Sequence, residues 1–67
     1  MHKPIWYLHE KVVRSWKMFQ RTIIPGSGYT LAEQKWWFRF YQEMCAQLNE
    51  ANEALVKENL EAERQAA

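Results

Sequence analysis

Residues 25–33 read PGSGYTLAE, and this stretch decides the fold because it holds the main break in the chain. Pro25 disfavours helix at the residue before it, and Gly26 and Gly28 can adopt positive φ at little cost. The chain has only two glycines and two prolines, so three of those four residues stand here. One break predicts two elements, joined by a turn at about residues 25–29 that reverses the chain direction.

The second element begins at the end of the same stretch. Thr30 and Glu33 have the spacing of a capping box, in which each side chain bonds the other residue's backbone N–H. No breaker follows, and good helix formers such as alanine, glutamate and leucine dominate the second half of the chain. We therefore expect a helix over residues 31 to about 63, with a frayed tail at 64–67.

The first element precedes the break. Pro4 suits the first turn of a helix, where its missing N–H would have had no partner, and no breaker follows before the turn. This predicts a helix over about residues 4–24. Its apolar residues recur at steps of three and four and form a stripe expected to meet the second helix. That stripe consists of Ile5, Leu8, Val12, Trp16, Phe19 and Ile23.

A basic face lies opposite the apolar stripe, formed by Lys11, Arg14, Lys17 and Arg21. Residues 1–24 carry five basic residues against one acidic residue, whereas residues 42–67 carry six glutamates against two basic residues. The two halves could attract each other within one chain or between chains. The basic face itself has three interpretations: a solvated surface, a site for an acidic protein, or a site for nucleic acid.

The second helix carries a heptad seam at Trp37, Tyr41, Met44, Leu48, Ala51 and Leu55. The first helix can cover this seam only as far as about Glu50, because it is much shorter. The apolar residues from mid-seam onward therefore predict an oligomer seam. Its members are Leu48, Leu55, Val56 and Leu60.

These patterns predict one all-α domain over residues 1–67. We expect an antiparallel two-helix hairpin with a longer second helix, which assembles into a helical bundle. A chain of 67 residues buries only about 60% of the surface that its unfolded form exposes, so it usually needs an additional stabilising element. Cys45 is the single cysteine, which excludes an internal disulfide. We therefore expect that assembly into a homodimer or higher oligomer supplies the additional stabilisation.

Cofactor chemistry and catalysis are not expected. His2, His9 and Cys45 lack the paired spacing of a zinc site, and no phosphate-binding loop or arranged nucleophile is visible. No apolar run approaches the roughly 18 to 20 residues that span a bilayer, so no membrane partner is expected. A lone thiol without a signal peptide predicts a cytoplasmic location, the host cytoplasm if the protein is viral.

An aromatic block raises the question of function. Residues 36–41 hold five aromatic side chains, and a single helix partner can cover only one face of them. Three interpretations remain open: a second hairpin covers the rest, a different protein binds there, or single-stranded nucleic acid stacks on the rings. The predicted partner-binding residues are Trp6, Trp36, Phe38 and Phe40.

The tryptophans Trp6, Trp16, Trp36 and Trp37 and the end EANEALVKENLEAERQAA carry a resemblance. In size and composition the chain resembles small accessory proteins encoded in the early regions of temperate bacteriophages. That resemblance implies a cytoplasmic helical hairpin that regulates a process by binding a host protein. The expected function is thus a non-catalytic interaction or regulatory protein that binds a partner protein as a homo-oligomer. The alternative is a small nucleic-acid-binding protein that uses the basic face.

Overall fold

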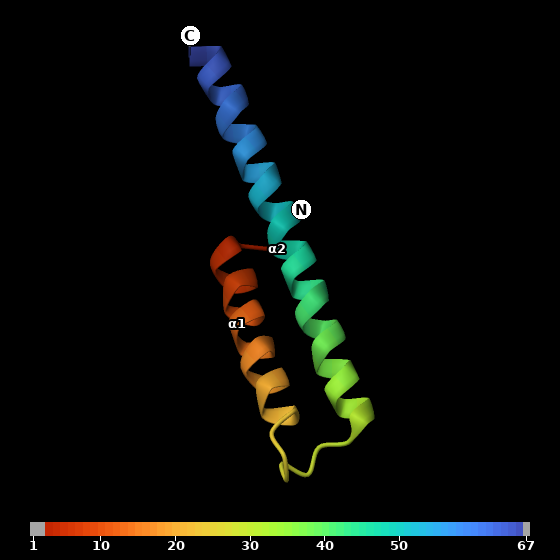
Figure 1. Cartoon of the computed structure of the whole chain (residues 1–67). Coiled ribbons are helices and arrows are strands. Elements are labelled where there is room, and N and C mark those ends of the chain that lie inside the picture. The colour runs from red at the N-terminus through yellow and green to blue at the C-terminus, as the bar shows by residue number, and fades with distance from the viewer. Residues whose placement is uncertain (1–2, 67) are drawn as a thin grey trace.

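The computed structural model describes residues 3–66 and shows an all-α antiparallel hairpin (Figure 1). Helix α1 spans Ile5–Thr22 and helix α2 spans Leu31–Ala66. The molecule is a rod of 59 Å by 15 Å by 15 Å, because α2 continues well past the start of α1. The predicted fold class, a two-helix hairpin with a longer second helix, is confirmed.

The connection between the helices is longer than expected because it begins earlier in the sequence. Helix α1 stops at Thr22, two residues before the expected end, and residues 23–30 are non-helical. The reason is a β-turn at residues 24–27, closed by a 3.1 Å hydrogen bond from the Ser27 N–H to the Ile24 carbonyl. Pro25 precedes Gly26 at φ +80°, the arrangement of a type II turn, which requires positive φ at its third residue.

The capping box at the start of α2 is formed as predicted. The Glu33 N–H donates to Thr30 Oγ1 at 3.2 Å, and the Thr30 N–H donates to Glu33 Oε1 at 3.3 Å. These bonds satisfy two N–H groups that a helix start would otherwise leave without a partner. At the other end, α2 remains helical through Ala66 and does not fray at residue 64. Residue 67 lies outside the described residues.

The contact face of α1 differs from the predicted stripe. The most buried residues are Leu8, Ser15 and Thr22, spaced by seven, whereas Trp16 is 40% exposed and Ile23 is 52% exposed. At 100° per residue the observed face is rotated by roughly 60° from the stripe. Small hydroxyl residues occupy the closest approach because a bulky ring there would push the helices apart. Each hydroxyl bonds a carbonyl three residues earlier in its own helix.

The contact face of α2 follows the predicted seam through its covered part. Met44 and Ala51 are buried, and Trp37, Tyr41 and Leu48 are half-buried. Two aromatic pairs cross the interface, Trp16 with Tyr41 at 5.0 Å and Phe19 with Phe38 at 5.1 Å between ring centroids.

At the turn end of the hairpin, a single backbone carbonyl links α1 to both the loop and α2. The carbonyl of Thr22 accepts a 3.0 Å hydrogen bond from Gln34 Nε2 of α2 and a 3.4 Å bond from Ser27 Oγ of the loop. A carbonyl in the last turn of a helix has no partner within that helix, so these two donors satisfy it. The bonds connect α1, the loop and α2 at one point.

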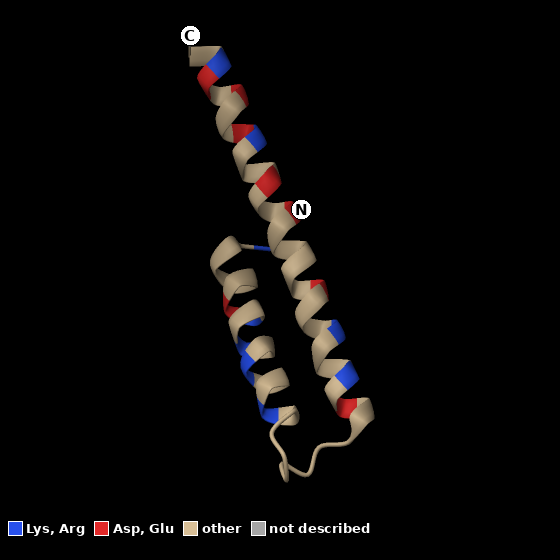
Figure 2. Ribbon diagram, viewed as in Figure 1, with Lys and Arg blue, Asp and Glu red and all other residues tan. Residues whose placement is uncertain are grey.

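The tail of α2, defined as residues 55–66, has no partner in the hairpin. All of its residues are exposed, and Ala51 is the last buried residue of α2. In Figure 1 the tail extends beyond the first turn of α1 as a single helix. Its acidic residues therefore lie apart from the basic residues of α1 (Figure 2).

Candidate protein-binding surface

Three aromatic rings form a cluster on one side of α2. Trp36 stacks on Phe40 with centroids 5.4 Å apart and planes at 5°. Trp37 stands edge-on to both, at 4.8 Å from Trp36 and 6.0 Å from Phe40. Residues four apart lie above each other on a helix, which brings the stacked pair together. Trp36 is nevertheless 57% exposed, so the cluster presents a large, pre-ordered apolar surface.

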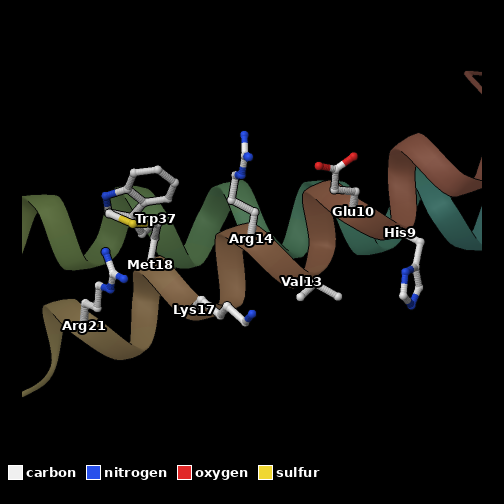
Figure 3. A pocket seen from close by; sticks show the side chains of 8 residues that line it. All are labelled: His9, Glu10, Val13, Arg14, Lys17, Met18, Arg21 and Trp37. Atoms are coloured by element: carbon white, nitrogen blue, oxygen red, sulfur yellow. The ribbon is translucent and has the colours of Figure 1, made fainter.

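The aromatic cluster continues into an open hollow along the outer side of α1 (Figure 3). The hollow has a volume of about 700 Å³, and Trp37 is its one lining residue from α2. Figure 3 shows Trp37 directly beside Met18, with Arg21 nearby. The remaining lining comes from α1: His9, Glu10, Val13, Arg14, Lys17, Met18 and Arg21.

The electrostatic character of the hollow comes from three cations. Arg14, Lys17 and Arg21 line it and are exposed, against one carboxylate at Glu10. Their spacing of three and four residues places them on one face of α1. The lining of the hollow combines the apolar side chains of Met18 and Val13 with the three cations. Such a surface matches a ligand that has both apolar and acidic groups.

Lys11 does not join the other three basic residues. Its Nζ lies 5.3 Å from the centroid of the Tyr7 ring, and Lys3 Nζ lies 5.2 Å from the same ring. Lys11 is half-buried, and its charge faces the tyrosine, an ordinary cation–π arrangement. The predicted basic face is thus divided, with Lys11 outside the hollow.

Trp6 and Phe38 lie away from the cluster. Trp6 is 70% exposed near the start of α1, at the opposite end of the helix pair from Trp36, and packs edge-on against Tyr7 at 6.1 Å. Phe38 lies roughly 200° around the α2 axis from Trp36 and packs against Phe19. Only Trp36 and Phe40 of the four predicted partner-binding residues therefore share one surface.

The predicted oligomer seam is also divided. Leu48 is half-buried on the face that meets α1, while Leu55, Val56 and Leu60 are exposed on the tail. No part of the chain within residues 3–66 covers the three tail residues, because α2 is much longer than α1. Leu48 belongs to the interior of the hairpin.

No metal-binding constellation occurs within residues 3–66, where no group of three His, Cys, Asp or Glu side chains converges. His2 lies outside the described residues.

Cys45 is a half-exposed free thiol beside Tyr41. A hydrogen bond with Cys45 raises the pKa of Tyr41 above its ordinary value of 10.0, and the charge of the cysteine thiolate adds to the effect. Neither helix, over its described length, has the extent and apolar character needed to cross a bilayer.

The roles of Ser15, Thr22 and Met18 were not anticipated from the sequence. The even spacing of Leu8, Ser15 and Thr22 is the signal that could have identified the close approach, because residues seven apart stay on one face. The contribution of Met18 depends on which α2 residue stands opposite, and no sequence pattern specifies this.

No protein-family model matches the chain, and no curated protein or solved structure matches it either.

Proposed function

We propose that this protein is a small, non-catalytic binding module that acts by occupying the surface of a partner protein. The observation that carries the proposal is the continuity of the Trp36–Trp37–Phe40 cluster, in which Trp36 is exposed and the other two rings are half-buried, with the cationic hollow of α1. Tryptophan and arginine dominate the energetics of protein interfaces. A large exposed apolar patch on a small protein is usually a binding site.

The partner that best fits this surface is an acidic amphipathic helix. Its apolar residues would contact the aromatic cluster and Met18, and its carboxylates would pair with Arg14, Lys17 and Arg21. The rings of the cluster are already packed against one another, which lowers the ordering cost of binding. The resemblance to phage accessory proteins suggests that the partner is a host protein, and the module would then act as a regulator.

The second candidate function is nucleic-acid binding, favoured by the three cations on one face of α1. Three observations weigh against it. Glu10 lies in the same hollow, and the tail adds glutamates that repel phosphate. Trp36 and Phe40 also stack on each other, which occupies faces that bases would need.

The test uses affinity capture from the source cells followed by mass spectrometry. Trp36→Ala with Phe40→Ala, and separately Arg14→Glu with Lys17→Glu, should each abolish capture of the same protein. The matched control is Trp6→Ala, which removes a more exposed tryptophan from outside the surface and should leave capture unchanged. Equal loss in all three variants would contradict the proposed site.

The nucleic-acid alternative is tested with the same variants. Fluorescence anisotropy with a labelled single-stranded oligonucleotide at low salt should show no binding by the wild type. Binding that weakens steeply with salt and disappears in Arg14→Glu with Lys17→Glu would favour the alternative over protein binding.

A further inference from the structure

The side of α2 that carries Phe38 has two apolar hollows that neither α1 nor the aromatic cluster fills. The first, near the turn, has a volume of about 220 Å³, and the second, on the tail, about 330 Å³. The first is lined by Phe19, Ile23, Leu31, Gln34, Lys35 and Phe38. The second is lined by Asn52, Glu53, Val56, Lys57 and Leu60.

The two hollows lie on the same face of α2 because their residues correspond at a spacing of eighteen. Lys35 corresponds to Glu53, and Phe38 corresponds to Val56. Eighteen residues make about five turns of an α-helix, so corresponding residues point in the same direction about 27 Å apart. The strip between them carries no charge, with Gln42, Cys45, Asn49 and Asn52 in turn.

The apolar residues of this face are exposed in the single chain. Leu31 is 65% exposed, and Ile23, Val56 and Leu60 are each more than half exposed. The pattern runs along α2 from Leu31 to Leu60, a length of about 44 Å. A long helix face that exposes an apolar patch at each end usually has a helical partner.

The charges on the strip select the orientation of that partner. The turn-end hollow has Lys35, and the tail hollow has Glu53 at the equivalent position. In a parallel pair of copies, the two lysines would lie at one level and the two glutamates at another, so no lysine would lie level with a glutamate. In an antiparallel pair, each lysine faces the glutamate of the other copy, and the pairing occurs twice.

We propose that this face binds a second copy of the chain, with the two α2 helices antiparallel and the two-fold axis close to Cys45. Lys35 lies level with Glu53 of the other copy when the axis passes near residue 44. Leu60 then lies within one turn of the other copy's Leu31. The tail of each copy covers the turn-end hollow of the other, and the tail gains the partner that its own hairpin lacks.

The dimer is independent of the proposed function. Trp36 lies roughly 200° around α2 from Phe38, so the aromatic cluster and the cationic hollow remain accessible in the dimer. Loss of dimerisation and loss of partner binding should therefore follow from different substitutions.

The charge test measures the dimer dissociation constant by sedimentation equilibrium. Lys35→Glu and Glu53→Lys alone should each raise the constant by about tenfold, since each removes two attractive contacts and creates two repulsive ones. The double variant should restore dimerisation. Glu61→Lys is the matched control, because its side chain lies off the strip, and it should leave the constant nearly unchanged.

The orientation test measures distances between nitroxide spin labels. A label on Cys45 should give a separation below about 20 Å, since packed helices lie 8–10 Å apart. In a Cys45→Ser background, a label at Glu63→Cys should give about 57 Å, the rise of twice nineteen residues.

Three results would overturn the proposal. The first is a protein that remains monomeric at every concentration. The second is a short distance between the labels at position 63, which would mean a parallel pair. The third is a dimer that Trp36→Ala disrupts and Lys35→Glu does not, which would assign self-association to the aromatic cluster.

Discussion

Ser15 shows how a single small side chain sets the distance between the helices. It is fully buried, and its Oγ donates a 3.0 Å hydrogen bond to the Val12 carbonyl of the same helix. The hydroxyl thus needs no partner from α2, and the residue contributes mainly by being small. Larger residues, Trp16 and Phe19, lie to one side of Ser15 and contact aromatic rings of α2.

Ser15→Leu should destabilise the fold by about 1–3 kcal/mol, because a larger side chain forces apart a close contact. Ser15→Ala should cost less than about 1 kcal/mol, since alanine fits the space and favours helix. Urea unfolding at fixed protein concentration measures both. Equal stability of the leucine variant and the wild type would mean that the helices do not approach closely at this residue.

Tyr41 offers a test of the contact with Cys45. Because the hydrogen bond with Cys45 raises the pKa of Tyr41, the phenol in the folded protein keeps its proton to higher pH than in the unfolded chain. This contribution to stability is complete below pH 10.0 and is lost as the pH rises through the raised pKa. The phenolate of Tyr41 can be followed by near-ultraviolet absorbance in a variant that carries Tyr7→Phe and Tyr29→Phe, so that Tyr41 is the one tyrosine left. Cys45→Ala should lower the pKa toward its ordinary value, and an unchanged titration would contradict the assigned contact.

At the scale of the elements, the start of α2 depends on local chemistry. The side chains of Thr30 and Glu33 bond each other as well as the backbone, with 3.1 Å between Thr30 Oγ1 and Glu33 Oε1. Thr30→Ala should lower stability by about 1 kcal/mol, and Thr30→Ser should retain most of it. Thermal unfolding followed by circular dichroism compares the two. A tolerated alanine would show that the cap contributes little beside the helix packing.

Features that depend on neighbouring residues were predictable from the sequence. The two helices, the break and the capping box follow from Pro25, Gly26, Thr30 and Glu33, which act within a few residues of themselves. The exposure of Trp36 was also predictable, because it lies off the seam, whereas Phe40 is half-buried.

Features that depend on packing were not predictable. The apolar stripe of α1 indicates a face centred on Val12 and Trp16, whereas the observed face centres on Ser15. Apolar periodicity reports which residues avoid water, but the closest approach depends on side-chain size on both helices. The hollow likewise requires Trp37 of α2 to stand beside Met18 of α1, a relation between residues far apart in sequence.

At the scale of the whole molecule, the proposed antiparallel dimer would have a distinctive length. With the two-fold axis near residue 44, the tails would project to opposite ends and the complex would be about 65 Å long, close to the 59 Å of one chain. A pair joined only through the tails would be far longer. Small-angle scattering should therefore show a thicker particle of nearly unchanged maximum dimension on dimerisation. A maximum dimension near twice that of one chain would contradict this arrangement.

The separation of acidic tail from basic α1 also gives the single chain a permanent electric dipole. The partial charges of α2 add to it, since the carboxyl end of a helix is negative and the tail has no antiparallel neighbour to cancel its share. A two-fold axis across the rod cancels the component of this dipole along the rod. Self-association would then change how the molecule responds to an applied field, and dielectric relaxation would weaken as protein concentration rises. Dissolved salt, which screens charges over about 10 Å at 0.1 M, would reduce the tendency of two chains to align before they touch.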